Sequence, residues 1–189
     1  MVNIFLASKS PRRIKFLKEM GLKFIIQPSK IDESLYIDEN LTPEEIVKKI
    51  AFEKARSIAE NKKEGIIIGA DTIVVLNNEI LGKPMDKKDA FRMLKKLSNS
   101  THKVITGLAI INIKGITIVD SETTLVTMRK INDEEIRSYI NSKEPLDAAG
   151  SYKIQEKGYK FIKKIEGDYE NVIGLPLSKF KDIFQKIQR

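Results

Sequence analysis

Asp71 is a charged residue inside a stretch that is otherwise apolar. The segment GIIIGADTIVVL, residues 65–76, is rich in β-branched residues and predicts a central strand buried on both faces. A carboxylate inside such a strand is costly unless it is paired, hydrogen-bonded or bound to a metal. Gly69 and Ala70 beside it leave room for a ligand to approach. Asp71 is therefore the strongest candidate for a catalytic or metal-binding carboxylate, and the structural alternative is that it caps a neighbouring loop.

Lys54 is a second charge in an apolar setting. It belongs to a helix predicted from Pro43 to about Glu60. Counted from Ile46 at about 100° per residue, the larger apolar residues of this helix spread from about 0° to about 140°, and Lys54 falls at about 80°. Such a lysine either packs its stem and extends its ammonium to solvent, or meets an anion inside the protein. We favour the anion.

Two arginines follow each other at the predicted start of the first helix. The segment LASKSPRR places Arg12 and Arg13 directly after Pro11, where the helix dipole disfavours cations. The N–H groups of that turn, the hydroxyls of Ser8 and Ser10, and the two arginines together predict an anion pocket. Neither GxxxxGKS/T nor GxGxxG occurs in the chain, so this is neither a P-loop nor a Rossmann phosphate site. A basic pocket with an inward carboxylate suits metal-assisted phosphate chemistry.

Other polar residues carry weaker signals. Lys83 lies on the predicted tight turn LGKP, where a lysine is normally solvated. Asp32 and Glu33 lie in a predicted loop, where by themselves they suit a turn, but they could join Asp71 around a hard cation. The chain has no cysteine and one histidine, His102. A thiolate or histidine-rich metal site is therefore excluded, and any metal is oxygen-bound, such as Mg²⁺ or Mn²⁺.

The composition is that of a globular protein. The 189 residues are 41% hydrophobic and 32% charged, which suits one solid core or two small lobes. No apolar run approaches the length of a membrane span, and the N-terminus shows no signal-peptide pattern, so a cytoplasmic protein is expected. The formal net charge of +8 suits a polyanionic partner. Because the lysines are spread along the whole chain, we favour a solvated basic surface instead.

Helix start signals and runs of β-branched residues alternate along the chain. Helices are expected from Pro11 to Gly21, from Pro43 to about Glu60, after Asp86, from Asn132 to about Asn141, and from Pro176 onward. Strands are expected in KFIIQ, GIIIGADTIVVL, SYKIQ and YKFIKKIEG, and a long hairpin is expected to turn at Lys114-Gly115. This pattern predicts an α/β protein with a large, twisted mixed sheet flanked by helices, as one unit or pinched into two lobes.

Taken in order, seven segments resemble the Maf family of nucleotide pyrophosphatases, also called septum-formation inhibitor-like proteins. The segments are LASKSPRR, EKA (53–55), GADTIVV (69–75), LGKP (81–84), LSNSTHKVITG (97–107), EPLDAAGSYKIQ (144–155) and IEGDYENVIGLPL (165–177). The resemblance implies a single domain over residues 1–189, an elongated α/β fold related to the inosine-triphosphate pyrophosphatases, and a site in a cleft between two lobes. It also implies hydrolysis of a nucleoside triphosphate to the monophosphate and pyrophosphate with Mg²⁺, Mn²⁺ or a similar ion.

The same resemblance implies roles for individual residues. Asp71 would be the general base that activates water for attack at the α-phosphorus, and Glu33 would help it to hold the metal. The residues that would bind and neutralise the phosphates are Ser8, Arg13, Lys54 and Lys83. For Lys54 and Asp71, these roles agree with the interpretation drawn from local patterns alone.

Three positions bear on base preference within the family. Members that resemble the dTTP/UTP type carry the residues found here as Arg12, Thr72 and Gln155. The branch that prefers 7-methyl-GTP typically has SPWR and SDQ in place of SPRR and ADT. Thr72 and Gln155 offer hydrogen-bonding groups that can read a pyrimidine edge. The segment SYKIQEKG departs from the usual YGIQG kind. Its Lys153, Glu156 and Lys157 make the loop bulkier and more charged, which predicts relaxed base selectivity.

The resulting hypothesis is a house-cleaning enzyme that removes dTTP, UTP or modified pyrimidine triphosphates, with a link to cell-division arrest. One alternative is a nucleic-acid-binding regulator of division, suggested by the net charge and by the family's name. Another is a non-catalytic nucleotide sensor. The chain shows no RNA-binding aromatic signature, basic tail or reader helix, and none of the expected catalytic residues is lost. We therefore favour the enzyme, and a homodimer is implied by the resemblance alone.

Overall fold

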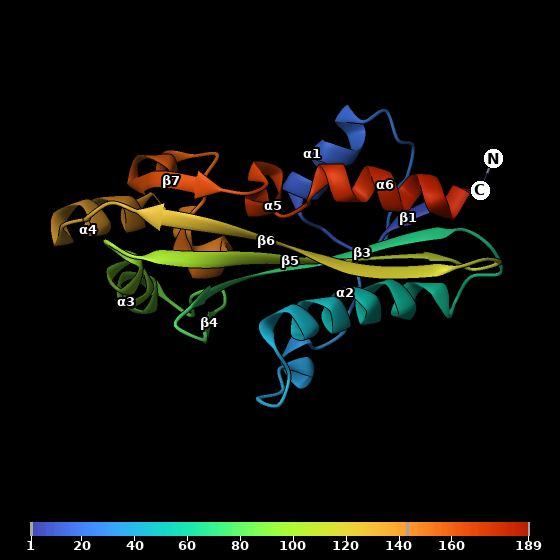
Figure 1. The fold of residues 1–189 in the computed structure, drawn as a ribbon, viewed down its shortest axis with the longest axis horizontal. Coiled ribbons are helices and arrows are strands. Elements are labelled where there is room, and N and C mark those ends of the chain that lie inside the picture. Colours follow the sequence, from blue (N-terminus) through green and yellow to red (C-terminus); the bar gives the residue numbers. More distant parts are fainter. Residues whose placement is uncertain (1, 143, 189) are drawn as a thin grey trace. The chain divides into compact units, whose positions relative to one another are not determined.

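The computed structural model describes residues 2–142 and 144–188, which form an α/β protein with helices packed against a sheet (Figure 1). The strands are β1 (Ile4–Leu6), β2 (Ile25–Ile26), β3 (Ile66–Leu76), β4 (Glu79–Leu81), β5 (Thr101–Asn112), β6 (Thr117–Met128) and β7 (Ile162–Glu166). The α-helices are α1 (Pro11–Glu19), α2 (Pro43–Ala59), α3 (Lys87–Leu97), α4 (Asp133–Asn141), α5 (Tyr169–Ile173) and α6 (Leu177–Gln188). Short 3-10 helices are η1 (Glu33–Tyr36), η2 (Glu144–Asp147), η3 (Ala149–Ser151) and η4 (Lys157–Phe161).

The sheet is mixed, as the sequence predicts. Its strand order is β2-β1-β3-β5-β6-β7, with β4 paired to β3. Strand β1 lies parallel to both β2 and β3, so that Phe5 pairs with Ile25 on one side and with Ile67 on the other. Strand β4 runs antiparallel to β3, and β7 runs antiparallel to β6. Parallel neighbours need a crossover connection, which α1 supplies between β1 and β2.

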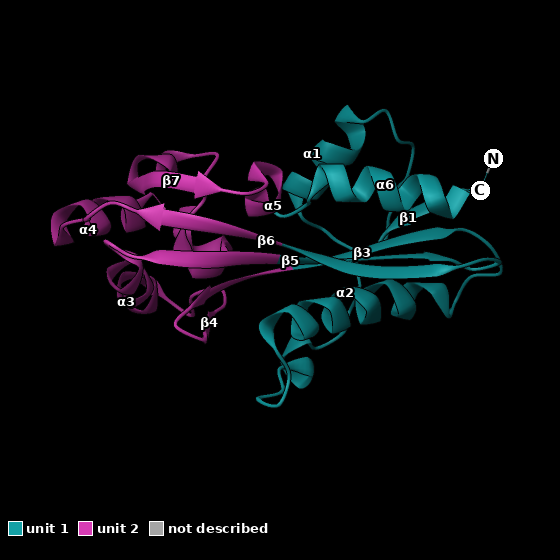
Figure 2. Ribbon diagram, in the orientation of Figure 1, with its two compact units in different colours: residues 1–71, 106–122, 174–189 teal, residues 72–105, 123–173 magenta. Residues whose placement is uncertain are grey.

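The described part of the chain divides into two compact units (Figure 2). Unit 1 comprises residues 1–71, 106–122 and 174–189, and unit 2 comprises residues 72–105 and 123–173. Strands β3, β5 and β6 each contribute residues to both units. The expectation of two lobes is thereby confirmed, and the boundary within β3 falls between Asp71 and Thr72.

In unit 1, helix α2 lies directly against the sheet. A Cβ atom at Gly69 of β3 would lie 2.2 Å from the carbonyl oxygen of Ala51, and one at Gly107 of β5 would lie 2.2 Å from that of Val47. These two glycines therefore allow the helix and the strands to approach with no side chain between them. The apolar cluster around this contact includes Phe5, Ala7, Ala51, Ala55, Ile58, Ile67, Ala109 and Ile111.

In unit 2, α3 and α4 pack against each other. The buried residues of this pair are Ala90, Met93, Leu94 and Leu97 of α3 and Ile136, Tyr139 and Ile140 of α4. Tyr139 meets the ring of Phe161 edge to face, with the ring centroids 5.1 Å apart. The buried face of α4 thus carries a hydroxyl group into the interior of unit 2.

The predicted helix starts agree with the structure. Thr42 and Glu45 form a reciprocal capping box at the start of α2, and Asn132 and Glu135 form another at the start of α4. Ser10 holds the N-cap position of α1 with an extended backbone, but its side chain makes no capping hydrogen bond. Its hydroxyl is therefore not committed to closing the helix end. Helix α5 has no counterpart among the predicted helices.

Some strand predictions are wrong in extent, and one is wrong in kind. Only Ile25–Ile26 of KFIIQ forms a strand, and the strand within YKFIKKIEG begins at Ile162 because η4 occupies the residues before it. The segment SYKIQ is not a strand, since η3 ends at Ser151 and residues 154–156 form a turn. The backbone N–H of Lys153 donates to the Tyr139 hydroxyl at 3.0 Å. A side chain therefore satisfies this amide, and no neighbouring strand is needed.

Candidate active site

Lys54, Asp71 and Glu33 form a three-membered ionic cluster in unit 1. The Nζ atom of Lys54 lies 2.7 Å from Oδ1 of Asp71 and 2.7 Å from Oε1 of Glu33. Lys54 and Asp71 are buried, as their local patterns predict, whereas the side chain of Glu33 is 55% exposed. Two carboxylates thus converge on one ammonium, with one of them on the solvent side.

The local sequence explains how the three side chains meet. Lys54 projects from the face of α2 that also buries Ile50 and Ile58, and Asp71 ends the part of β3 that belongs to unit 1. Because Gly69 lets α2 rest on β3, the lysine reaches the strand at the level of the aspartate. The carboxylate of Glu33 comes from η1, whose residues contact α2.

Arg13 and Ser8 form a second polar group in unit 1. The Nε atom of Arg13 donates to the carbonyl of Gly174 at 2.8 Å, and its Nη1 donates to Oγ of Ser8 at 3.3 Å. The same Oγ accepts the backbone N–H of Ser10 at 3.2 Å. Ser8 and Arg13 are therefore held together at the start of α1, as the expected anion pocket requires.

The guanidinium of Arg13 is buried, and the charges of Asp71 and Glu33 affect its pKa. Burial lowers the pKa of Arg13, the charge of Asp71 raises it, the charge of Arg12 lowers it and that of Glu33 raises it. The charges of both carboxylates therefore act on Arg13 within unit 1. Unit 1 thus combines two buried cations, Arg13 and Lys54, with two carboxylates, and these are the groups that a polyanionic ligand with a bound cation needs.

Of the remaining expected residues, Arg12 is half-buried in α1 of unit 1, and the others belong to unit 2. Thr72 is half-buried in β3, and Gln155 is exposed in the turn of residues 154–156. The Nζ atom of Lys83 pairs with Oδ1 of Asp147 at 3.0 Å, and both side chains are largely exposed. The backbone N–H of Gly150 donates to the carbonyl of Gly82 at 3.0 Å. The LGKP turn is therefore tied to the segment EPLDAAGSYKIQ.

Sequence reasoning gave no role to Asp147 or to the buried polar residues of unit 2. Asp147 lies 64 residues from Lys83 along the chain, and an aspartate in a turn-rich segment carries no signal by itself. His102 is 2% exposed and its Nε2 lies 2.8 Å from the hydroxyl of Tyr152. Burial lowers the pKa of His102 to about 4. Its position at a strand start offered no indication of this partner.

A divalent cation fits the donor set of unit 1. Among residues 2–142 and 144–188 there is no cluster of three or more histidine, cysteine, aspartate or glutamate side chains arranged to hold a metal ion. Glu33 and Asp71 do converge on a single positive charge, the Lys54 ammonium. Mg²⁺ is typically held by one or two carboxylates together with substrate phosphates and water. Two oxygen donors from the protein are therefore compatible with such an ion.

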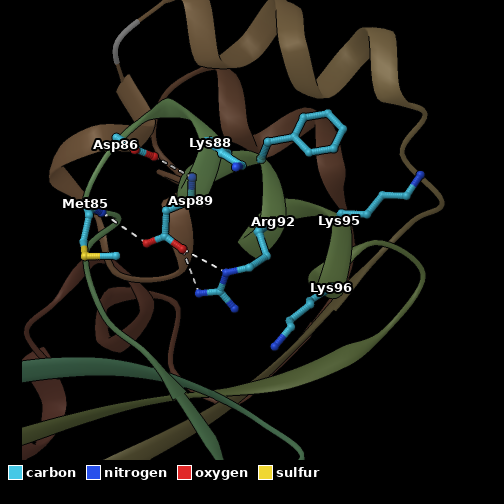
Figure 3. Close-up of a pocket in the computed structure, with 8 residues that line it drawn as sticks. Met85, Asp86, Lys88, Asp89, Arg92, Lys95 and Lys96 are labelled. Atoms are coloured by element: carbon cyan, nitrogen blue, oxygen red, sulfur yellow. Dashed lines mark hydrogen bonds and ion pairs between the residues drawn. The ribbon is translucent and has the colours of Figure 1, made fainter.

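A hollow of about 680 Å³ lies along α3 in unit 2 (Figure 3). Asp89 accepts the backbone N–H of Met85 at 3.1 Å and Nε of Arg92 at 2.9 Å, so the charges that line it are partly paired. Its lining residues are Met85, Asp86, Lys88, Asp89, Phe91, Arg92, Lys95 and Lys96. None of the site residues expected from the sequence is in that set, so this hollow is not the predicted site.

Two solved structures share this fold. A HAM1 protein from Coxiella burnetii superimposes with a TM-score of 0.54 at 15% identity, covering 98% of this chain and 100% of that chain. A nucleoside-triphosphatase / dITP/XTP pyrophosphatase from Mycobacterium abscessus gives a TM-score of 0.50 at 13% identity, covering 97% and 94%. At identities this low, the superpositions show a shared fold and nothing more, and that fold agrees with the α/β class expected from the sequence.

Sequence comparison assigns the chain to one family. The family profile described as Maf-like protein matches residues 3–187, and the chain belongs to that family. A protein from Acetivibrio thermocellus is 48% identical over 193 residues, covering 98% of this chain and 95% of its own. One from Thermosipho africanus is 49% identical over 182 residues, covering 96% and 92%. Both relatives are named dTTP/UTP pyrophosphatase. No helix in the described part of the chain is long and apolar enough to cross a membrane.

Proposed function

We propose that this protein hydrolyses dTTP, UTP and modified pyrimidine nucleoside triphosphates to the monophosphate and pyrophosphate, with the help of a divalent cation. The proposal rests on one arrangement, the buried Lys54 ammonium that joins Asp71 and Glu33, with the Arg13 guanidinium electrostatically coupled to the same carboxylates. Relatives at 48% and 49% identity that bear the name dTTP/UTP pyrophosphatase support it.

Asp71 acts as the general base in this proposal. Its carboxylate takes a proton from a water molecule, the water oxygen bonds to the α-phosphorus, and the bond from that phosphorus to the α,β-bridging oxygen breaks. Pyrophosphate leaves with the electron pair of the broken bond. Lys54 forms an ion pair with Asp71 before the nucleotide binds. If the ammonium then pairs with a phosphate oxygen of the substrate instead, the Asp71 carboxylate becomes available to accept the proton.

The phosphates of the substrate need cationic partners. Arg13 and Lys54 supply two in unit 1, and Ser8 adds a hydroxyl that already contacts Arg13. Lys83 supplies another cation in unit 2, where its contact with Asp147 is exposed and readily exchanged. Glu33 and Asp71 would hold a Mg²⁺ or Mn²⁺ ion, which when bound supplies Lewis-acid polarisation of a phosphate oxygen.

In this proposal, Arg12, Thr72 and Gln155 determine the base preference. Gln155 presents an exposed carboxamide, which can donate to and accept from a pyrimidine edge. The ammonium of Lys153 lies 3.6 Å from the carboxylate of Glu156, so an ion pair flanks Gln155 on both sides in sequence. This bulkier turn supports selectivity that extends to modified pyrimidines.

The proposed biological role is removal of unwanted nucleotides from the cytoplasmic pool by a homodimeric enzyme. A link to cell-division arrest is part of the same proposal, and it follows from the family's alternative name alone. Depletion of the gene followed by measurement of nucleotide pools and of septum formation would test both roles. An unchanged pool would contradict the house-cleaning role whatever the effect on division.

The reaction is tested by measuring pyrophosphate release from canonical and modified nucleoside triphosphates with Mg²⁺ or Mn²⁺. Wild type, Asp71→Asn and Glu60→Gln are compared, since Glu60 is an exposed carboxylate at the C-terminal cap of α2, where it pairs with Arg56. Hydrolysis of dTTP and UTP that disappears in Asp71→Asn and persists in Glu60→Gln is the expected result. Absence of pyrophosphate release from every triphosphate would contradict the proposed reaction, and activity confined to 7-methyl-GTP would contradict the base assignment.

A further inference from the structure

Gln155 is exposed at the tip of a turn and has no regular secondary structure to fix its orientation. Residues 154–156 form this turn, in which Ile154 is buried and Gln155 and Glu156 face solvent. A hydrogen-bonding group discriminates between bases only when it is held close to its productive position. The contacts that anchor the turn from inside unit 2 therefore bear directly on what Gln155 can do.

The first anchor comes from α4. The Tyr139 hydroxyl accepts the backbone N–H of Lys153 at 3.0 Å, two residues before Gln155. Tyr139 is 4% exposed, and its ring packs edge to face on Phe161. The hydroxyl therefore has a fixed place, and it anchors the backbone just before the turn.

The second anchor comes from the start of β5. The Tyr152 hydroxyl lies 2.8 Å from Nε2 of His102, and the two rings meet edge to face at 5.5 Å. Both side chains are at least nine-tenths buried. Within the described residues the other ring nitrogen of His102, Nδ1, has no hydrogen-bond partner. The hydrogen bond between His102 and Tyr152 therefore links the start of β5 to the residue that precedes Lys153.

The far side of the turn is closed as well. The backbone N–H of Lys157 donates to Oε2 of Glu144 at 3.1 Å. A Cβ atom at Gly158 would lie 2.6 Å from the carbonyl oxygen of Lys153 and 3.0 Å from the Tyr139 hydroxyl. The chain after the turn therefore packs against the same tyrosine that holds the chain before it.

We propose that Tyr139, together with the Tyr152–His102 pair, forms a set of positioning residues that orient Gln155 and thereby set base preference. This inference rests on the proposed function, because it concerns how the same site distinguishes nucleotides. The three side chains act through the backbone of Lys153 and its neighbours and do not touch the substrate. Their loss is expected to change which base is accepted, with little effect on the hydrolytic step in unit 1.

The test is a Tyr139→Phe substitution, which removes the acceptor of the Lys153 amide and keeps the ring. Tyr159→Phe is the matched control, since Tyr159 is 60% exposed in the same segment. For dTTP hydrolysis, Tyr139→Phe should raise KM about tenfold while kcat changes less than about twofold, and the preference for dTTP over GTP should fall toward that of Gln155→Ala. Tyr159→Phe should behave as wild type.

A double mutant separates positioning from a general structural role. If Tyr139 acts through Gln155, Tyr139→Phe combined with Gln155→Ala should show the base preference of Gln155→Ala alone. Additive losses would overturn the inference, because they would mean that Tyr139 acts independently of Gln155. Tyr152→Phe provides a second variant should Tyr139→Phe fail to fold, and it is expected to lower the same preference.

The outcomes also distinguish this inference from the proposed function. If wild type releases pyrophosphate with a clear base preference and both tyrosine variants keep that preference, only the positioning inference fails. If wild type releases no pyrophosphate from any nucleoside triphosphate, the proposed function fails and the positioning inference fails with it. A wild type that hydrolyses all bases equally would overturn the inference while leaving the proposed reaction intact.

Discussion

The Lys54 ammonium lies 2.7 Å from the Asp71 carboxylate, and only about a tenth of each side chain is exposed. A buried ion pair contributes little net stability relative to an apolar pair, but removal of one partner leaves the other charge buried and uncompensated. Here the lysine also contacts Glu33 at 2.7 Å. One cation therefore balances two carboxylates, and its loss has consequences for both stability and chemistry.

Substitution of Lys54 by methionine should lower the free energy of unfolding by about 3 kcal/mol, because the buried Asp71 carboxylate loses its counter-charge. It should also lower kcat/KM for triphosphate hydrolysis by about a hundredfold or more, since a phosphate-neutralising cation is lost. Urea unfolding and pyrophosphate release measure the two effects. Lys49→Met, at an exposed position of the same helix, is the control and should change stability by less than about 0.5 kcal/mol. Equal stability of the two variants would contradict the pairing.

Substitution of Gly69 by alanine should separate α2 from β3. The added methyl group would lie 2.2 Å from the carbonyl oxygen of Ala51, and forced overpacking of this kind typically costs about 1–3 kcal/mol. Activity should fall further than stability, because Lys54 and Asp71 come from the two elements that are pushed apart. Thermal unfolding and pyrophosphate release, with Gly82→Ala as a stability control because a Cβ there meets nothing within 4 Å, provide the test. A Gly69→Ala protein with normal activity would show that the close approach is dispensable.

The burial of His102 predicts a pH dependence of stability. Its pKa is lowered from 6.5 to about 4 by burial, so between these values the unfolded chain binds a proton that the folded protein does not. Stability therefore falls as the pH drops from about 6.5 toward about 4, by about 2 kcal/mol between pH 7 and pH 4.5 from this residue. Urea unfolding of wild type and His102→Gln at both pH values measures it. The variant should lose less stability on acidification, and an identical loss in both proteins would contradict a neutral, buried imidazole.

Lys83 and Asp147 form an exposed pair, with side chains 63% and 65% exposed. Such pairs contribute about 0–1 kcal/mol to stability, so Lys83→Ala should leave the unfolding free energy almost unchanged. If Lys83 binds a substrate phosphate, the same substitution should raise KM about tenfold. Lys114→Ala is the matched control, because Lys114 is 69% exposed and pairs with Glu64 at 2.8 Å. The role assigned to Lys83 is wrong if both lysine variants have the same KM.

Much of the secondary structure and two of the site residues could be predicted from interactions between residues that are close together in the sequence. The capping boxes at Thr42 and Asn132 depend on residues three positions apart, and the long strand β3 depends on a continuous run of β-branched residues. Asp71 and Lys54 stood out because each breaks the pattern of its own segment. Such signals involve a few neighbouring residues, so they can be read without knowledge of how the chain folds.

The turn around Gln155 shows where local rules end. The alternation of buried Tyr152 and Ile154 with more exposed neighbours resembles a strand, but the amide of Lys153 donates to Tyr139. A side chain from a distant helix thus replaces the neighbouring strand that a β-pattern assumes. The sequence of the segment SYKIQ contains no signal that Tyr139 would accept this hydrogen bond.

By itself, the sequence determined the helix starts, the central strand, the oxygen-only character of any metal site and the two charges that had to be compensated inside. The tertiary structure decided how they are compensated. It brought Glu33 and Asp71 to one ammonium, set α2 against β3 at Gly69, and paired Lys83 with Asp147 across 64 residues. The physical reason is that capping and strand formation depend on neighbours along the chain, whereas ion pairs and close packing depend on which distant segments the folded core places side by side.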